Sequence, residues 1–149
     1  MKLAADADVV LSALIGGRAR LVLTHPQVRE VFTTEHSFSE VEEYAPVLAR
    51  QKHLPSDILL LAIAALPVTI VVYTHYANSI AEATKRIGRR DREDIDLLAL
   101  ALHLQIPILV ETTGTSSGSM LTCLPPKAYC AIFASLSSMT LRSDAGLGA

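Results

Sequence analysis

Residues 2–14 read KLAADADVVLSAL, and this stretch decides the fold class of the chain. The short apolar run from Leu3 to Ala5 ends at Asp6, and apolar residues then recur at the spacing of a helix. These apolar residues are Val9, Val10, Ala13 and Leu14. The pair Gly16-Gly17 ends the segment. The stretch therefore predicts a strand, an acidic residue at its carboxyl end, and a helix.

The same alternation of strands and helices continues as far as residue 110. The pattern predicts further strands at 28–33, 68–73 and 106–110. It predicts further helices at 18–24, 35–52, 55–66, 80–87 and 95–103. Thr34 is a candidate cap for the helix that follows it, and the almost wholly β-branched run at 68–73 is typical of a strand buried on both faces. Such an alternation indicates an α/β fold with a mainly parallel sheet and helices on its faces.

Length and composition indicate a single domain over residues 1–149. A chain of 149 residues can bury about two-thirds of its unfolded surface in one core. Half of the residues are apolar and tryptophan is absent, so the core must consist mainly of aliphatic side chains. The net charge of −2 means that nucleic-acid binding would depend on local basic patches.

The start of the chain favours a cytoplasmic protein without a membrane anchor. No long apolar segment precedes Asp6, which argues against a secretory signal. The most apolar stretch, 58–73, is interrupted by Pro67 and is shorter than the roughly 20 residues that a bilayer requires. Cys123 and Cys130 have no zinc-type spacing and are expected to be reduced thiols.

The character of the sequence changes at residue 112. Serine, threonine and glycine crowd 112–119, and no acidic residue occurs between Glu111 and Asp144. We expect an atypical, flexible tail over 112–149, with a loop and one short apolar element around 128–136. One hypothesis is that the tail is translated in a shifted reading frame, which comparison of the nucleotide sequence with close relatives would test.

Three acidic residues are candidates for a metal site. Functional side chains collect at the carboxyl ends of parallel strands, because the loops there converge. Asp6 follows the first strand, Glu40 lies in the helix after the second, and Asp94 begins the helix before the fourth. Carboxylates that converge repel one another unless a divalent cation neutralises them. Their all-oxygen chemistry favours Mg²⁺ or Mn²⁺ over zinc.

A hard cation held by carboxylates suits the hydrolysis of phosphodiester bonds, since it activates a water and neutralises charge on the phosphate. Positive charge stands next to the third acid in the sequence, at Arg89, Arg90 and Arg92. These arginines are candidates for contacts with the phosphates of RNA that flank the scissile bond.

The ordered set of segments resembles the PIN-domain family. Residues 1–15 resemble the opening of that domain, 38–44 its second motif, and 91–102 with 106–108 its third. Together they cover residues 1–111. The resemblance implies a three-layer α/β/α sandwich around a mainly parallel sheet.

The resemblance also implies an activity and a set of ligands. Family members include the metal-dependent endoribonuclease toxins of bacterial toxin and antitoxin pairs, which are commonly homodimers inhibited by an antitoxin. Carried over to this chain, the metal-binding and catalytic acids are Asp6, Glu40 and Asp94, with Asp91 and Asp96 as substitutes. The family expects a further acidic motif after the fourth strand. Either Glu111 replaces a ligand of that motif, or the site lacks that ligand and is incomplete.

Two other functions remain open on the sequence. The pair Asp6 and Asp8 also resembles the nucleophile motif of haloacid dehalogenase-type phosphatases. Alternatively, the chain is a degenerate PIN-like module that binds RNA or a partner without cutting. Either aspartate also suits a simple helix cap. Metal-dependent RNA cleavage would favour the nuclease, and hydrolysis of a small phosphate ester would favour the phosphatase.

Overall fold

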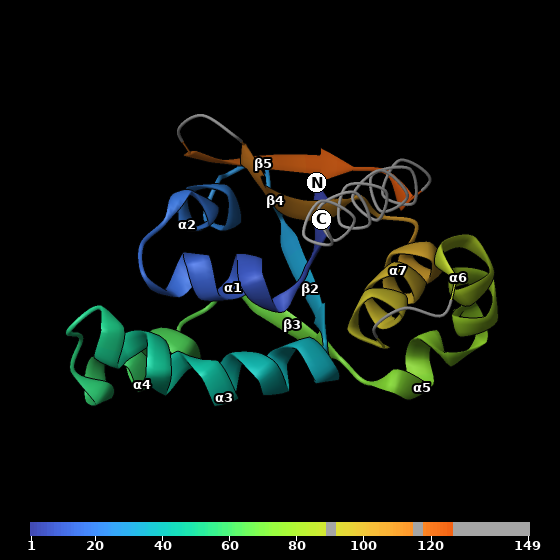
Figure 1. Ribbon diagram of the computed structural model, residues 1–149. Helices are drawn as coiled ribbons and strands as arrows, with labels where there is room; N and C mark the ends of the chain where they lie inside the picture. Colours follow the sequence, from blue (N-terminus) through green and yellow to red (C-terminus); the bar gives the residue numbers. More distant parts are fainter. Residues whose placement is uncertain (89–91, 115–117, 127–149) are drawn as a thin grey trace, which may run out of the picture.

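The computed structural model describes residues 1–88, 92–114 and 118–126, and its centre is a five-stranded sheet (Figure 1). The strands are β1 (Lys2–Ala5), β2 (Glu30–Thr34), β3 (Val68–Val71), β4 (Ile108–Gly114) and β5 (Gly118–Leu124). Their order across the sheet is β3-β2-β1-β4-β5. All neighbouring pairs are parallel except β4 with β5. The predicted α/β fold with a mainly parallel sheet is confirmed.

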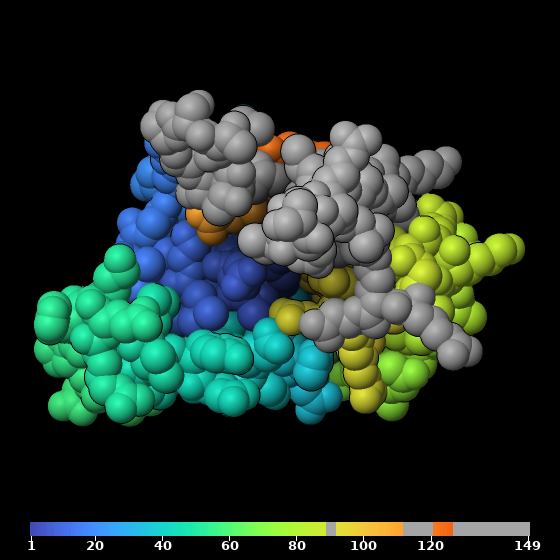
Figure 2. All heavy atoms as spheres, in the orientation of Figure 1, coloured from blue at the N-terminus to red at the C-terminus, as the bar shows by residue number. Residues whose placement is uncertain are grey.

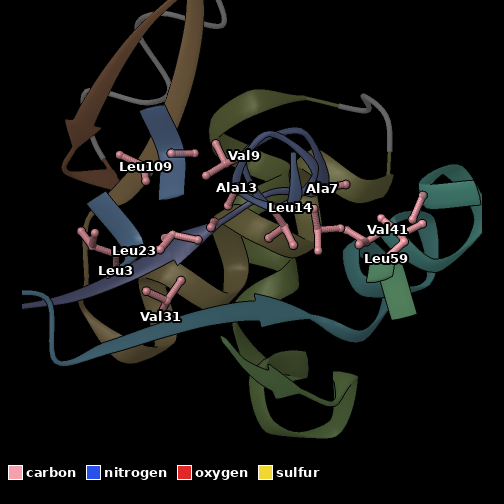
Figure 3. Close-up of a cluster of buried hydrophobic side chains, with 14 of the residues drawn as sticks. Leu3, Ala7, Val9, Ala13, Leu14, Leu23, Val31, Val41, Leu59 and Leu109 are labelled. Carbon is pink, nitrogen blue, oxygen red and sulfur yellow. The ribbon is translucent and has the colours of Figure 1, made fainter. Parts of the chain in front are cut away.

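Helices cover both faces of the sheet and complete three layers. Successive residues of a strand point to opposite faces, so Leu3 and Ala5 pack into one hydrophobic cluster and Ala4 into the other. The first cluster, shown in Figure 3, includes residues of α1 (Ala7–Leu14), α2 (Arg18–Leu23), α3 (Glu35–Gln51) and α4 (Ser56–Ala64). The second includes residues of α5 (Tyr73–Tyr76), α6 (Ile80–Ile87) and α7 (Arg92–Leu104), and a 3₁₀ turn, η1 (Ala77–Ser79), joins α5 to α6.

The two connections that leave β1 and enter β4 lie on opposite faces. The chain passes from β1 to β2 through α1 and α2, on the face of the first cluster. It enters β4 from α7, which packs on the face of the second cluster. Because β1 and β4 are adjacent and parallel, a crevice is expected at their carboxyl ends, the usual place for a ligand in an open α/β sheet.

The strand predicted at 68–73 is shorter and less buried than its sequence indicated. β3 ends at Val71 and lies at an edge of the sheet, and Ile70 is 43% exposed. The prediction of burial on both faces was wrong. β-branched residues favour extended backbone wherever a strand lies, so they do not distinguish an edge from a centre.

The predicted loop over 112–119 was also wrong for the residues that the structure describes. β4 continues to Gly114, and β5 pairs with it in an antiparallel ladder from Ile108↔Leu124 to Gly114↔Gly118. Threonine is compatible with strands, and the ladder satisfies backbone groups that a loop would leave to water. Residues 115–117 and the apolar element predicted around 128–136 lie outside the described part of the chain.

No helix within the described residues is both long enough and apolar enough to span a membrane. Cys123 is a free thiol on β5, as expected of a reduced cysteine. Cys130 is not among the described residues.

Thr34 caps α3 as predicted, and its loss is expected to destabilise the fold. Its hydroxyl accepts a hydrogen bond from the Ser37 backbone N–H at 3.0 Å and is fully buried. We expect Thr34→Ala to lower the free energy of unfolding by about 1 kcal/mol. Thr24→Ala is the matched control, because the Thr24 hydroxyl is exposed and bonds only the carbonyl of Arg20 among the described groups. Urea unfolding of both variants measures the change. Equal losses of unfolding free energy in the two variants would contradict the capping role of Thr34.

Candidate functional site

Asp6 stands at the carboxyl end of β1, beside β4. Ala5, the last residue of β1, pairs with Leu109 of β4, so Asp6 lies beside β4 just past the end of β1. Its Oδ1 accepts a hydrogen bond of 2.9 Å from the backbone N–H of Val9. Asp6 therefore caps α1, and this cap is one of the two roles that its position in the sequence allowed.

Asp6 lies partly buried among other carboxyl groups, which affect its pKa. Burial raises the pKa of Asp6 to about 6, and the hydrogen bond from Val9 opposes that rise. The negative charges of Asp8, Asp94 and Glu111 raise the pKa further. Acids from α1, α7 and β4 thus lie within electrostatic range of the end of β1.

Glu93, at the start of α7, links this group of acids to α3. Burial raises its pKa to about 8, and the next causes are a hydrogen bond with Glu40 and the charge of Glu40. This hydrogen bond favours the protonated form of Glu93, which donates it to Glu40. The charges of Asp6 and Asp94 raise the pKa too. The hydroxyl of Ser37 lies 3.4 Å from Oε1 of Glu93 and donates to it.

These five carboxyl groups form what we call the acidic cluster: Asp6, Glu40, Glu93, Asp94 and Glu111. They come from four separate parts of the chain: the junction of β1 and α1, and the elements α3, α7 and β4. In Figure 2 the start of the chain (blue), α3 (cyan) and the start of α7 (yellow) meet near the centre of the face shown. The three acids singled out in the sequence, and Glu111, thus belong to one neighbourhood.

Glu93 is the member that the sequence analysis missed. The helix predicted at 95–103 begins after Glu93, whereas the structure begins α7 at Arg92. A signal was nevertheless present. Leu97 and Leu100 follow Glu93 at helical spacing and are buried, so Glu93 lies on the inward face of the helix.

The remaining candidates lie apart from the acidic cluster or outside the described residues. Asp96 is 3% exposed and accepts a hydrogen bond from the Tyr76 hydroxyl at 3.3 Å. It therefore packs against α5 instead of substituting for Asp94. Arg92 begins α7 with its guanidinium 5.9 Å from the centre of the Tyr73 ring. Asp91, Arg89 and Arg90 fall outside the part of the chain that the structure describes.

The chemistry of the acidic cluster fits a hard divalent cation, although its present spacing is not that of a closed metal site. Among the described residues, no group of three or more His, Cys, Asp or Glu side chains is arranged to hold an ion. Oxygen donors are the ligands that Mg²⁺ and Mn²⁺ prefer. The raised pKa values of Asp6 and Glu93 show that positive charge at this place would stabilise the ionised carboxyls.

The profile of a family described as the PIN domain matches residues 5–113 of the chain. The match begins just before Asp6 and ends within β4, so it spans the whole acidic cluster. No curated protein matches the chain.

Proposed function

The chain belongs to the PIN-domain family, whose members are generally nucleases, and we propose that it is a metal-dependent endoribonuclease of the toxin type. The reaction is the hydrolysis of phosphodiester bonds in RNA. The observation that carries the proposal is the acidic cluster at the carboxyl end of β1, beside β4. The connections that leave β1 and enter β4 lie on opposite faces of the sheet there, which is the usual place for a ligand.

In this proposal Asp6, Glu40 and Asp94 hold Mg²⁺ or Mn²⁺, and Glu111 and Glu93 stand beside them. The ion, when bound, supplies an acidified water and neutralises charge on the phosphate. The chain supplies the orientation of the carboxyls. Asp6 is held by its bond with Val9, and Glu40 lies on α3, whose first turn Thr34 fixes. Ser37 in that turn also holds Glu93.

The partners of the proposed nuclease are RNA, an antitoxin protein and a second copy of the chain in the cytoplasm. Arg92 supports the RNA contact, because it is exposed at the start of α7, next to Glu93. Support for a homodimer comes from large apolar side chains exposed on α3 and α4. These are Tyr44, Val47, Ile58, Leu60 and Leu61.

The two alternative functions differ in how well they are supported. A haloacid dehalogenase-type phosphatase has no support from the family match. A degenerate PIN-like module that binds RNA without cutting has one observation in its favour, the absence of a metal-holding group of three side chains among the described residues. An assay of cleavage separates this module from the nuclease.

The direct test is cleavage of RNA with and without a divalent ion. We expect end-labelled RNA to be cut internally in Mg²⁺ or Mn²⁺ and to remain intact in a chelator, because the ion supplies the acidified water. A small phosphate ester serves as the control substrate and should not be hydrolysed. Equal cleavage in the chelator, or intact RNA under all ionic conditions, would contradict the proposal.

Binding of the ion can be measured independently of cleavage. A ligand that binds only the folded state raises the melting temperature. We expect Mg²⁺ or Mn²⁺ to raise the melting temperature of the unmodified protein more than that of Asp6→Asn. Asp57→Asn is the matched control, since Asp57 is exposed in the first turn of α4 and is not among the residues whose charges raise the pKa of Asp6. Equal shifts in all three proteins would mean that the ion does not bind at the acidic cluster.

A further inference from the structure

A polar pocket with a volume of about 280 Å³ lies beside the acidic cluster, between α3, α5 and α7. Its lining includes His36 and Ser39 of α3, Tyr73 and Tyr76 of α5, and Arg92 and Asp96 of α7. Two of these residues directly precede members of the acidic cluster, Ser39 before Glu40 and Arg92 before Glu93. The pocket is therefore close enough to receive a part of the RNA strand next to the scissile bond.

The wall of the pocket on α5 is aromatic. Tyr73 is 41% exposed, although α5 is otherwise anchored by the fully buried Tyr76. The edge of one ring meets the face of the other, with centroids 5.6 Å apart and planes at 74°. This contact, together with the Arg92 guanidinium that lies over the ring 5.9 Å from its centroid, holds the Tyr73 ring in place. The ring and the guanidinium plane provide surfaces against which a nucleobase can stack.

The pocket also contains a buried carboxylate. Asp96 is 3% exposed and accepts the hydrogen bond of Tyr76 through Oδ2. Among the contacts that the structure describes, that bond is the only one made by the side chain of Asp96, so Oδ1 and the second lone pair of Oδ2 are left to accept from a ligand. A buried carboxylate that lines a pocket selects a ligand with hydrogen-bond donors, because only donors compensate it for lost water.

The four bases differ in the hydrogen-bond donors and acceptors that they would present to this carboxylate. The Watson–Crick edge of guanine carries two adjacent donors, N1–H and the N2 amino group, which match the two oxygens of one carboxylate. Adenine and cytosine place an acceptor beside their amino group, and uracil has one donor between two acceptors. An acceptor directed at Asp96 would be repelled. Guanine is therefore the base that fits both the aromatic wall and the carboxylate.

We propose that this pocket binds a guanine base of the RNA, next to the bond that the acidic cluster cleaves. Arg92 at its rim would contact the phosphate of the same nucleotide, since its guanidinium lies 5.9 Å from the Tyr73 ring and it begins α7 beside Glu93. The position of the cut relative to this guanine rests on the proposed nuclease function. The binding of guanine does not.

The first experiment measures binding without cleavage. Guanosine, adenosine, cytidine and uridine 5′-monophosphates are titrated to millimolar concentration in a chelator, with amide NMR shifts as the readout. We expect guanosine monophosphate to bind about 10-fold or more tightly than the others, as expected for one bidentate base contact. The shifts should map to residues of α5 and the start of α7. No shifts at these residues, or equal affinities for the four nucleotides, would overturn the proposal.

Matched variants test which side chains recognise the base. Tyr73→Ala should weaken binding of guanosine monophosphate about 10-fold, because the stacking surface is lost. Tyr44→Ala should not change it, since Tyr44 is also exposed, at 53%, but lies outside the pocket. Asp96→Asn should abolish the preference for guanine, because a carboxamide offers one acceptor and one donor, and it still accepts from Tyr76. A guanine preference retained in Asp96→Asn, or equal losses in the two tyrosine variants, would contradict the assignment.

A cleavage experiment separates this inference from the proposed function. RNA substrates that differ at one position near a mapped cut should be cleaved faster with guanine than with other bases, and Tyr73→Ala should reduce that preference. Cleavage without any base preference, together with no nucleotide binding, overturns the pocket assignment and leaves the nuclease intact. Binding of guanosine monophosphate by a protein that cuts no RNA would support the pocket assignment and contradict the nuclease.

Discussion

Asp6→Asn is expected to lower the rate of RNA cleavage by more than about 100-fold while leaving the protein folded. Groups that merely support a metal ligand contribute about 10- to 100-fold, so the loss of a ligand itself should exceed that range. The fold should survive because asparagine also caps helices, and its side-chain oxygen can still accept from the Val9 N–H. The substitution also removes one charge from the acidic cluster, where Asp8, Asp94 and Glu111 disfavour ionisation of Asp6.

The control for this experiment is the same chemical change at Asp57. Asp57 is exposed in the first turn of α4, and it is not among the residues whose charges raise the pKa of Asp6. Single-turnover rates on one RNA substrate, with circular dichroism to verify folding, give the comparison. Asp94→Asn should behave like Asp6→Asn. Unchanged rates for both of these variants would refute the assignment of the acidic cluster to catalysis.

In a chelator, the free energy of unfolding is expected to fall as the pH rises from about 4 to about 8. The pKa of Asp6 is raised from 3.8 to about 6 and that of Glu93 from 4.5 to about 8, in both cases chiefly by burial. A carboxyl with a raised pKa binds its proton more tightly in the folded state. Its contribution is complete below the pKa of the unfolded chain and is lost as the pH passes the pKa of the folded protein.

Asp6 alone is expected to account for about 2 kcal/mol of this loss, most of it between pH 4 and pH 6. Glu93 extends the loss toward pH 8. Urea unfolding at a series of pH values measures both. Glu93→Gln should flatten the upper part of the profile, because glutamine carries no proton to lose and can still donate to Glu40. Glu42→Gln, an exposed acid on α3, should leave the profile unchanged.

A profile that does not fall between pH 4 and pH 8 would mean that Asp6 and Glu93 are not buried among other carboxyls in solution. A fall that Mg²⁺ reverses at pH 8 would strengthen the metal assignment, since the ion replaces the protons as the source of positive charge. The same measurement therefore examines the geometry of the acidic cluster and its proposed ligand.

Much of the fold follows from local patterns in the sequence. The apolar run before Asp6 is β1, the helical spacing after it is α1, and Thr34 caps α3. Residues of β1 divide between the two hydrophobic clusters in strict alternation, as the period of a strand requires. The ordered motifs also indicated the PIN-domain family, which the match over residues 5–113 confirms.

The errors share one physical origin. Whether β3 is at the edge or the centre of the sheet depends on its partners, and the β-branched run at 68–73 carries no information about them. The residues after Thr112 were expected to form a loop because of their composition, yet β4 and β5 pair along seven positions from residue 108 to residue 114. Pairing between strands is a tertiary preference that overrides the local one.

The amino-acid sequence by itself determined the order of the main strands and helices as far as β4, the acid that follows β1 and the family of the chain, because each of these depends on residues close together along the backbone. Only the tertiary structure decided which acids meet. Glu93 joined Glu40 and Asp6, whereas Asp96 turned to Tyr76, although it is only three residues from Glu93. Glu93 and Asp96 are nearly one turn apart on α7, so the helix alone gives them similar directions. The packing of α3 beside Glu93 and of α5 beside Asp96 decides which side chain each carboxyl meets. The raised pKa values have the same origin, since burial exists only after the layers have packed.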